Sequence, residues 1–222
     1  MSFELVAPQE NYAASLDFYN KGGNCMGISS LWVRELFRRN TSSLAEPNVI
    51  EGRGLQARYG FFSKGAKCVQ DADVAFWSEQ ASLLCNFGVK KIIARDYSSS
   101  VALVNSLPEK FSNTAILTGW QYSDKQSCLD RFGFYRPSAQ GGHVVALFKL
   151  KGAGEIYMYD ANFGVHKWHP TSGVSLKTDM KRYMIEAGYG LIAKMDVAMM
   201  LSTNNDIPAD KKPVDFSAFR YD

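Results

Sequence analysis

The chain has 222 residues, of which 46% are hydrophobic and 21% charged, and its net charge is +3. This length supports one well-buried core and is short for two. So small and dispersed a charge does not predict nucleic-acid binding, and no stretch approaches the roughly 18 consecutive apolar residues of a transmembrane helix. The N-terminal residues carry Glu4, Glu10 and Asp17 and lack a basic start with an apolar run, so they do not match a conventional secretory signal peptide.

The first part of the chain is expected to be mainly helical. Residues 1–19 show little periodicity and are interpreted as a lead-in, whereas residues 26–39 have the helical spacing of apolar side chains. Residues 40–65 are polar and contain glycines, so they are expected to form a long connection with at most a short helix. A second helix is predicted over residues 71–86, with one shared apolar face: Val74, Trp77, Ala81, Leu84 and Cys85.

The rest of the chain is expected to contain most of the strands. The expected elements up to residue 142 are a short strand or helix extension over 89–95, a helix over 98–111 capped by serines 98–100, a strand over 113–120 and a polar loop over 121–142. Strands are then expected over 143–150 and 155–160, with an extension or further strand at 165–168. The chain is expected to end with a helix over 176–187 closed by Gly188, a last strand over 191–201 and a polar tail over about 204–222. Helices mainly first and strands mainly last predict an α+β fold in one domain, 1–222.

Cys25 stands out because of its place at the head of the first predicted helix. A loop rich in glycine and asparagine, residues 20–24, leads into it, and the apolar residues Ile28, Leu31 and Trp32 follow at helical spacing. The free N–H groups and the positive dipole end of a first helical turn favour a thiolate over a thiol. A buried apolar role is the more common one for a free cysteine, so Cys25 becomes a candidate nucleophile only together with a base.

The other three cysteines, Cys68, Cys85 and Cys128, offer no recognisable motif. No pair has C-x-x-C spacing, which argues against a zinc ribbon or a thioredoxin-like motif. They are interpreted as free thiols or buried apolar residues, the usual state in a reducing compartment.

His143 and Asp160 are predicted to meet across a β-hairpin. A two-residue loop at 151–152 would place them directly opposite each other, with Cβ atoms about 5 Å apart. A four-residue loop at 151–154 would make Asp160 a diagonal neighbour of His143 on the same face, still within reach. A three-residue loop would place the two side chains on opposite faces of the sheet. Two of these registers therefore bring a carboxylate to an imidazole.

This pairing suits acid–base chemistry on a thiol. An aspartate that accepts one ring N–H fixes the tautomer and stabilises the imidazolium, while the other ring nitrogen can take a proton from a cysteine. Taken singly, His143 fits a strand-end histidine and Asp160 a turn residue. Their conjunction with Cys25 at the head of a helix is much rarer, and it predicts a catalytic group.

His166 and His169 form a weaker H-x-x-H pattern, which could bind a metal if a third ligand lay nearby. Residues three apart on a strand face opposite ways, however, so a surface or substrate-rim role is favoured over a metal site.

Three blocks of sequence resemble the conserved blocks of the YopT/AvrPphB family, papain-like cysteine proteases of bacterial effectors. They are residues 23–32 (GNCMGISSLW), 142–147 (GHVVAL) and 159–164 (YDANFG), so the resemblance covers about residues 20–165. The resemblance implies a papain-like cysteine protease fold, in which a helical lobe packs on an antiparallel β-sheet.

By this resemblance Cys25 is the nucleophile, His143 the general base and acid, and Asp160 the residue that orients the histidine. Asn20 matches the polar side chain that the family uses in its oxyanion hole, with the Cys25 backbone N–H as second donor. Asn24 is a weaker candidate for the same role. No metal or organic cofactor is implied. The short stretch before Cys25 shows no long targeting or self-processed region.

The resemblance also implies a partner and a place of action. Substrates would be host signalling proteins, such as lipidated small GTPases or kinases, and the chain would be secreted by a specialised bacterial system into the host cytoplasm. Two alternatives stay open: the same three residues could serve glutamine deamidation or transglutamination, or the fold could be a non-catalytic binding module. The substrate, the cleaved bond and the oligomeric state are left open.

Overall fold

The structure is a computed structural model. It describes residues 2–8, 24–39, 47–67, 69–109, 113–123, 140–150, 154–189 and 192–203. Asn20, Cys68, Cys128 and the predicted tail 204–222 lie outside these residues. Among the helices described, none combines the length and apolar character that a bilayer crossing requires.

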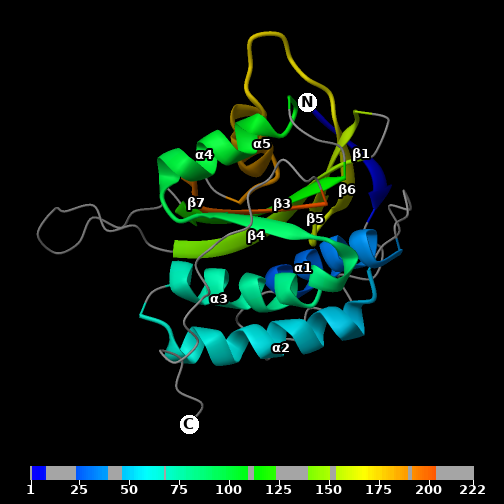
Figure 1. Cartoon of the computed structure of the whole chain (residues 1–222). Coiled ribbons are helices and arrows are strands. Elements are labelled where there is room, and N and C mark those ends of the chain that lie inside the picture. The colour runs from blue at the N-terminus through cyan, green and yellow to red at the C-terminus, as the bar shows by residue number, and fades with distance from the viewer. Residues whose placement is uncertain are drawn as a thin grey trace, which may run out of the picture.

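A single antiparallel sheet forms the centre of the molecule (Figure 1). Its seven strands lie in the order β1-β6-β5-β4-β3-β7-β2, and every neighbouring pair is antiparallel. The strands are β1 (Phe3–Pro8), β2 (Lys90–Ala94), β3 (Thr114–Ser123), β4 (Gln140–Lys149), β5 (Ile156–Asp160), β6 (Gly164–Trp168) and β7 (Ile192–Ser202). The fold is therefore α+β, as the order of predicted elements indicated.

Helices cover both faces of this sheet (Figure 1). One face is covered by α1 (Cys25–Arg39), α2 (Val49–Gly65) and α3 (Val69–Ser82), and the other by α4 (Tyr97–Ser106) and α5 (Leu176–Glu186). The central strands are apolar at successive positions because both of their faces are buried. In β4, Val144 packs into the core on the α1 side, and Val145 into the core on the α5 side.

Glycines allow α1 and α2 to pack against each other at close range. A Cβ atom on Gly27 would lie 2.1 Å from the carbonyl oxygen of Gly52, and one on Gly52 would lie 2.5 Å from Cγ1 of Ile28. Asn48 begins α2 as its N-cap, because its side chain accepts hydrogen bonds from the N–H groups of Ile50 and Glu51. The glycines that pointed to a connection over 40–65 are thus residues of a helix interface, and that prediction was wrong for Val49–Gly65.

Three further predictions differ from the structure. Residues 3–8 of the expected lead-in form edge strand β1, which pairs with β6. The second helix ends at Ser82, so Cys85 lies in a following 3₁₀ turn and is exposed. The glycines before His143 belong to β4, where they pair with β3.

The remaining predicted elements agree closely with the structure. Strand β2 lies within 89–95, β7 nearly matches 191–201, and α5 is followed by Gly188 with a φ of 84°. The helix predicted over 98–111 is shorter in the structure, because α4 ends at Ser106. It is capped by Asp96, whose side chain accepts from the N–H of Ser99, and not by the serines.

We expect Gly52→Ala to lower the free energy of unfolding by about 1–3 kcal/mol, since the new methyl group overpacks the α1–α2 contact. Gly54→Ala is the matched control in the same helix. No atom lies within 4 Å of a Cβ at Gly54, so the better helix propensity of alanine should raise stability by about 0.5–1 kcal/mol. Chemical denaturation measures the change in the free energy of unfolding of each variant. Equal changes for Gly52→Ala and Gly54→Ala would contradict the close packing at Gly52.

Candidate active site

The β4–β5 hairpin brings His143 and Asp160 together. Val145 pairs with Asp160 and Lys149 with Ile156, which is the register in which Asp160 is a diagonal neighbour of His143 on the same face. Strand β5 ends at Asp160, so His143 lies two residues beyond the last β4–β5 pair. His143 therefore lies at the end of the β4–β5 ladder. On its other side it pairs with Trp120 of strand β3.

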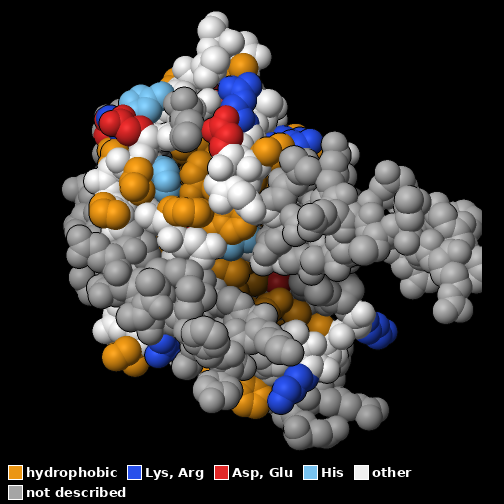
Figure 2. All heavy atoms as spheres, turned by 180° about the vertical axis from the view of Figure 1, so that it is seen from behind, with side chains coloured by type: hydrophobic (Ala, Val, Ile, Leu, Met, Phe, Trp, Pro, Cys, Tyr) orange, Lys and Arg blue, Asp and Glu red, His pale blue; other side chains and the backbone are white. Residues whose placement is uncertain are grey.

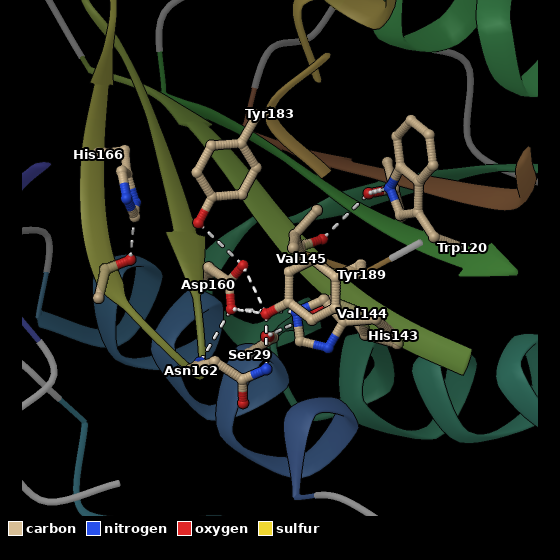
Figure 3. A network of polar contacts seen from close by, with 12 residues as sticks. Ser29, Trp120, His143, Val144, Val145, Asp160, Asn162, His166, Tyr183 and Tyr189 are labelled. Carbon is tan, nitrogen blue, oxygen red and sulfur yellow. Dashed lines mark hydrogen bonds and ion pairs between the residues drawn. The ribbon is translucent and has the colours of Figure 1, made fainter. Parts of the chain in front are cut away.

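A short hydrogen bond joins the two side chains, both of which are buried. Nε2 of His143 lies 3.0 Å from Oδ1 of Asp160, and the two residues are 4% and 0% exposed (Figure 3). Since Nε2 donates to the carboxylate, Nδ1 is the ring nitrogen left to exchange a proton with another group.

Asp160 is surrounded by hydrogen-bond donors. Besides His143, its oxygens accept from the backbone N–H of Asn162 at 2.8 Å, from the Tyr183 hydroxyl at 3.0 Å and from the Tyr189 hydroxyl at 2.8 and 2.9 Å (Figure 3). Burial alone would raise the pKa of Asp160, but the charge and hydrogen bond of His143 and the other donors outweigh it and lower that pKa. The carboxylate is therefore held ionised in the interior.

Cys25 begins helix α1 and is partly exposed. Two contacts attach this helix to the residues next to His143 and Asp160. The Ser29 hydroxyl donates to the carbonyl of Val144 at 3.2 Å, and the Trp32 ring stacks on Tyr159 with centroids 5.2 Å apart. The first turn of α1 is thereby fixed relative to both strands of the hairpin.

A contact from α2 completes the first turn of α1. Gly27 N–H, one of the groups that has no partner within a helix, donates to Oε1 of Gln56 at 2.9 Å. The carbonyl of Asn24 accepts from Ile28 N–H at 3.0 Å, and Asn24 itself is buried. Cys25 thus lies at the positive end of a helix whose start is held from two sides.

Cys25 lies close enough to His143 to affect the pKa of its ring. Burial of the ring lowers the pKa of His143, but the charge and hydrogen bond of Asp160, followed by the effect of Cys25, raise it to about 10. The structure thus places Cys25 near the hydrogen-bonded pair of His143 and Asp160. A sulfur, an imidazole and a carboxylate in this order can move a proton from the thiol to the ring and hold the resulting imidazolium.

One face of the molecule carries hydrophobic side chains (Figure 2). Figure 2 shows a histidine side chain at the border of a hollow, with an acidic side chain deeper inside and hydrophobic side chains around it. A partly exposed cysteine beside a buried histidine suits a nucleophile that must be reached by a large substrate.

The sequence analysis missed Tyr183, Tyr189 and the backbone of Asn162. Tyr183 lies in α5 and Tyr189 just after it, so they follow Asp160 by 23 and 29 residues. Gly188 indicated that the helix ends there, but no sequence pattern indicates that the ring of Tyr189 faces His143. Asn162 belongs to an Asp-x-Asn turn, which is a recognisable local motif.

The two remaining histidines do not form a metal site with each other. His166 is buried and its Nδ1 lies 3.2 Å from the carbonyl oxygen of Gly164, whereas His169 is exposed and contacts Glu4. Among the described residues, no group of three or more His, Cys, Asp or Glu side chains is arranged to bind a metal. The pKa of His166 is lowered, chiefly by burial, so its ring is neutral at pH 7.

The expected oxyanion residue Asn20 lies outside the described residues, so the role given to it stays a prediction. Cys85 is a free thiol on the surface. Cys68 and Cys128 are likewise outside the described part of the chain.

Comparison with known proteins finds a distant resemblance in three dimensions. No family model matches the sequence, and no curated protein matches it. The crystal structure of the Pseudomonas avirulence protein AvrPphB is similar to this chain with a TM-score of 0.46 and 14% sequence identity. The match covers 89% of this chain and 96% of that chain. The interpretation of the site rests on the contacts described above.

We expect the His143 ring to titrate near pH 10 and Asp160→Asn to move its midpoint down toward or below 6.5, because the amide keeps the shape but not the charge that opposes burial. By linkage, the contribution of protonated His143 to the free energy of unfolding is fully present below pH 6.5 and is lost as the pH rises through about 10, whereas that of ionised Asp160 is lost as the pH falls through its lowered pKa. The ring Cε1–H signal, followed by NMR against pH, reports the midpoint.

The control is Asp96→Asn, which removes one carboxylate from an exposed helix cap where asparagine caps equally well. This variant should leave the His143 midpoint unchanged. A wild-type midpoint near 6.5, or one that Asp160→Asn does not move, would contradict the described electrostatics.

Proposed function

We propose that the protein is a cysteine protease of papain-like type, with Cys25 as nucleophile, His143 as general base and acid, and Asp160 as the orienting residue. The observation that carries this proposal is the buried, hydrogen-bonded pair of His143 and Asp160, with Cys25 at the start of α1 near enough to help raise the pKa of the His143 ring. The order of the three residues along the chain and the blocks around them, which resemble those of the YopT/AvrPphB family, support it.

The thiol would be activated by its neighbours. His143 takes the Cys25 proton at Nδ1, because Nε2 is occupied by Asp160. The resulting imidazolium is stabilised by the ionised carboxylate, and the thiolate lies at the positive end of the α1 dipole. The thiolate and the imidazolium are therefore both stabilised before a substrate binds.

Peptide-bond cleavage follows from this arrangement. The thiolate adds to the carbonyl carbon, and the oxyanion is stabilised by the Cys25 backbone N–H and, by resemblance, by Asn20. His143 then gives its proton to the leaving amine, which breaks the C–N bond and leaves an acyl-enzyme. A water molecule, deprotonated by His143, attacks the thioester and releases the acid and the free thiol.

The wider setting is proposed from the resemblance alone. Residues 1–222 would act as one catalytic domain, since strands from Phe3 to Ser202 share one sheet. The substrate would be a host signalling protein of the small GTPase or kinase type, and the chain would reach the host cytoplasm by bacterial secretion. The same acyl-enzyme chemistry serves deamidation and transglutamination, so the experiment must identify the product.

We expect Cys25→Ala and His143→Ala to reduce cleavage by roughly a thousandfold or more, because either change removes a partner that acts as a unit with the other. The assay adds wild-type or variant protein to a cell lysate and identifies new peptide N-termini by mass spectrometry. Cys85→Ala is the matched control, since it removes an exposed thiol that the mechanism does not use.

The products separate the proposal from its rivals. New N-termini that depend on Cys25 support proteolysis, whereas a mass shift of about 1 Da at glutamine or a crosslink would identify deamidation or transglutamination instead. Equal alkylation rates of Cys25 and Cys85, with no product of any kind, would indicate a binding module. Circular dichroism of each variant verifies that the fold is retained.

A further inference from the structure

Tyr189 makes two different contacts with the His143–Asp160 pair. Its ring lies against the His143 ring, with centroids 4.2 Å apart and an angle of 22° between the planes. Its hydroxyl donates to the Asp160 carboxylate and accepts from Nδ2 of Asn162 at 2.6 Å. Figure 3 shows the tyrosine ring over the imidazole, with its oxygen between Asp160 and Asn162.

The end of helix α5 places this ring. Gly188 has a φ of 84°, a conformation that glycine adopts readily, and the N–H of Tyr189 returns to the carbonyl of Met184 at 3.0 Å. The chain therefore reverses directly after α5, and Tyr189 is 8% exposed against the sheet. A defined helix ending, and not a free loop, determines the position of the ring.

A hydrogen bond to Asp160 does not by itself fix the plane of the imidazole. Rotation about the Cβ–Cγ bond of histidine is broad, and one N–H···O contact tolerates a range of ring tilts. Nδ1 exchanges its proton with Cys25 along a direction that lies in the ring plane, so tilting the ring turns Nδ1 away from the sulfur. A second aromatic ring packed on the face of His143 removes that freedom.

Stacking also keeps water from the His143–Asp160 hydrogen bond. His143 is 4% exposed and Asp160 is fully buried, with Tyr189 covering one face of the imidazole. Hydrogen bonds to ions are stronger in such a surrounding than in water. The face of an aromatic ring also attracts the imidazolium cation.

We propose that Tyr189 is a positioning residue, whose stacked ring holds the His143 imidazole in the plane from which Nδ1 meets the Cys25 sulfur. The inference rests on the proposed function in that the aligned imidazole is the general base. It adds that the ring of Tyr189, more than its hydroxyl, determines how fast the thiol reacts.

Tyr183 provides the matched comparison within the same site. Its hydroxyl also donates to Asp160, at 3.0 Å, and it is 7% exposed, much as Tyr189 is. Its ring, however, packs edge-on against His166 and Phe3. Tyr183→Phe therefore removes one donor from Asp160 without changing the ring that faces the imidazole of His143.

The experiment compares Tyr189→Leu, Tyr189→Phe and Tyr183→Phe with the wild type. The first readout is the rate at which iodoacetamide alkylates Cys25 at pH 7, with Cys25→Ala defining the background from other thiols. The second is the His143 Cε1–H chemical shift, which the ring current of a stacked tyrosine or phenylalanine moves upfield. Thermal unfolding verifies that each variant is folded, and neither readout needs a known substrate.

We expect Tyr189→Leu to lower the alkylation rate roughly tenfold or more, as misplacement of a catalytic group does, and to move the His143 signal downfield. Tyr189→Phe keeps the ring and should keep both the wild-type signal and a rate within about threefold of the wild type, although it removes one donor to Asp160 and the acceptor of Asn162. Tyr183→Phe should likewise stay within about threefold, because it removes one donor among several to Asp160. With a cleavage assay in hand, kcat should follow the alkylation rate while KM stays unchanged.

Two results would overturn the inference: a folded Tyr189→Leu variant that alkylates at the wild-type rate, or a Tyr189→Phe variant that is as slow as Tyr189→Leu. Failure of the proposed function is distinct from both. One such result is a wild type that cleaves no protein although Cys25 is reactive and its alkylation rate depends on Tyr189. The other is a wild type in which Cys25 is alkylated no faster than the exposed thiol of Cys85.

Discussion

The structure around the candidate site depends on one buried anion, the carboxylate of Asp160. A buried charge is tolerated only where hydrogen bonds replace its lost hydration. Here a histidine, a backbone N–H and two tyrosine hydroxyls supply them. Four donors from strand β4, the turn after β5 and the end of α5 must therefore meet at one residue, so this carboxylate depends on strand pairing, a turn and a helix end together.

The helical layers on the two faces of the sheet contribute different residues to the candidate site. On one face, α1 presents Cys25 and is attached to the hairpin through Ser29 and Trp32, at the strand residues adjacent to His143 and Asp160. On the other face, α5 and the turn after it supply Tyr183 and Tyr189. Cys25 and the two tyrosines that hydrogen-bond Asp160 thus come from opposite layers, with the central strands between them.

The sequence predicted the local parts of this site better than the distant ones. Apolar spacing located α1, and alternation with turn signals located the β4–β5 hairpin, because these patterns follow from which side chains a helix or strand buries. The hairpin register could be narrowed to two favourable choices, and the structure has one of them. Contacts between residues far apart, such as His143 with Tyr189, leave no periodic trace in a single sequence.

The mispredicted segments have the same physical cause. Helix α2 was taken for a connection because glycine disfavours helices, yet Gly52 is needed where α2 meets α1, and only the partner helix reveals this. Strand β1 was missed because an exposed edge strand alternates weakly, and its place is determined by pairing with β6, far along the chain. Tertiary contacts overrode local preference in both cases.

The anchoring of α5 has a consequence for the order of events during synthesis. Asp179 of this helix accepts hydrogen bonds from Ser2 at 2.6 Å and from Trp168 at 3.0 Å, one turn before Tyr183. Ser2 before β1 and Trp168 at the end of β6 thus both attach α5, which carries Tyr183 and precedes Tyr189. A chain emerging from the ribosome would contain Cys25, His143 and Asp160 before the tyrosines that hydrogen-bond Asp160, so a nascent polypeptide completes these surroundings only after translation has passed α5 and Tyr189.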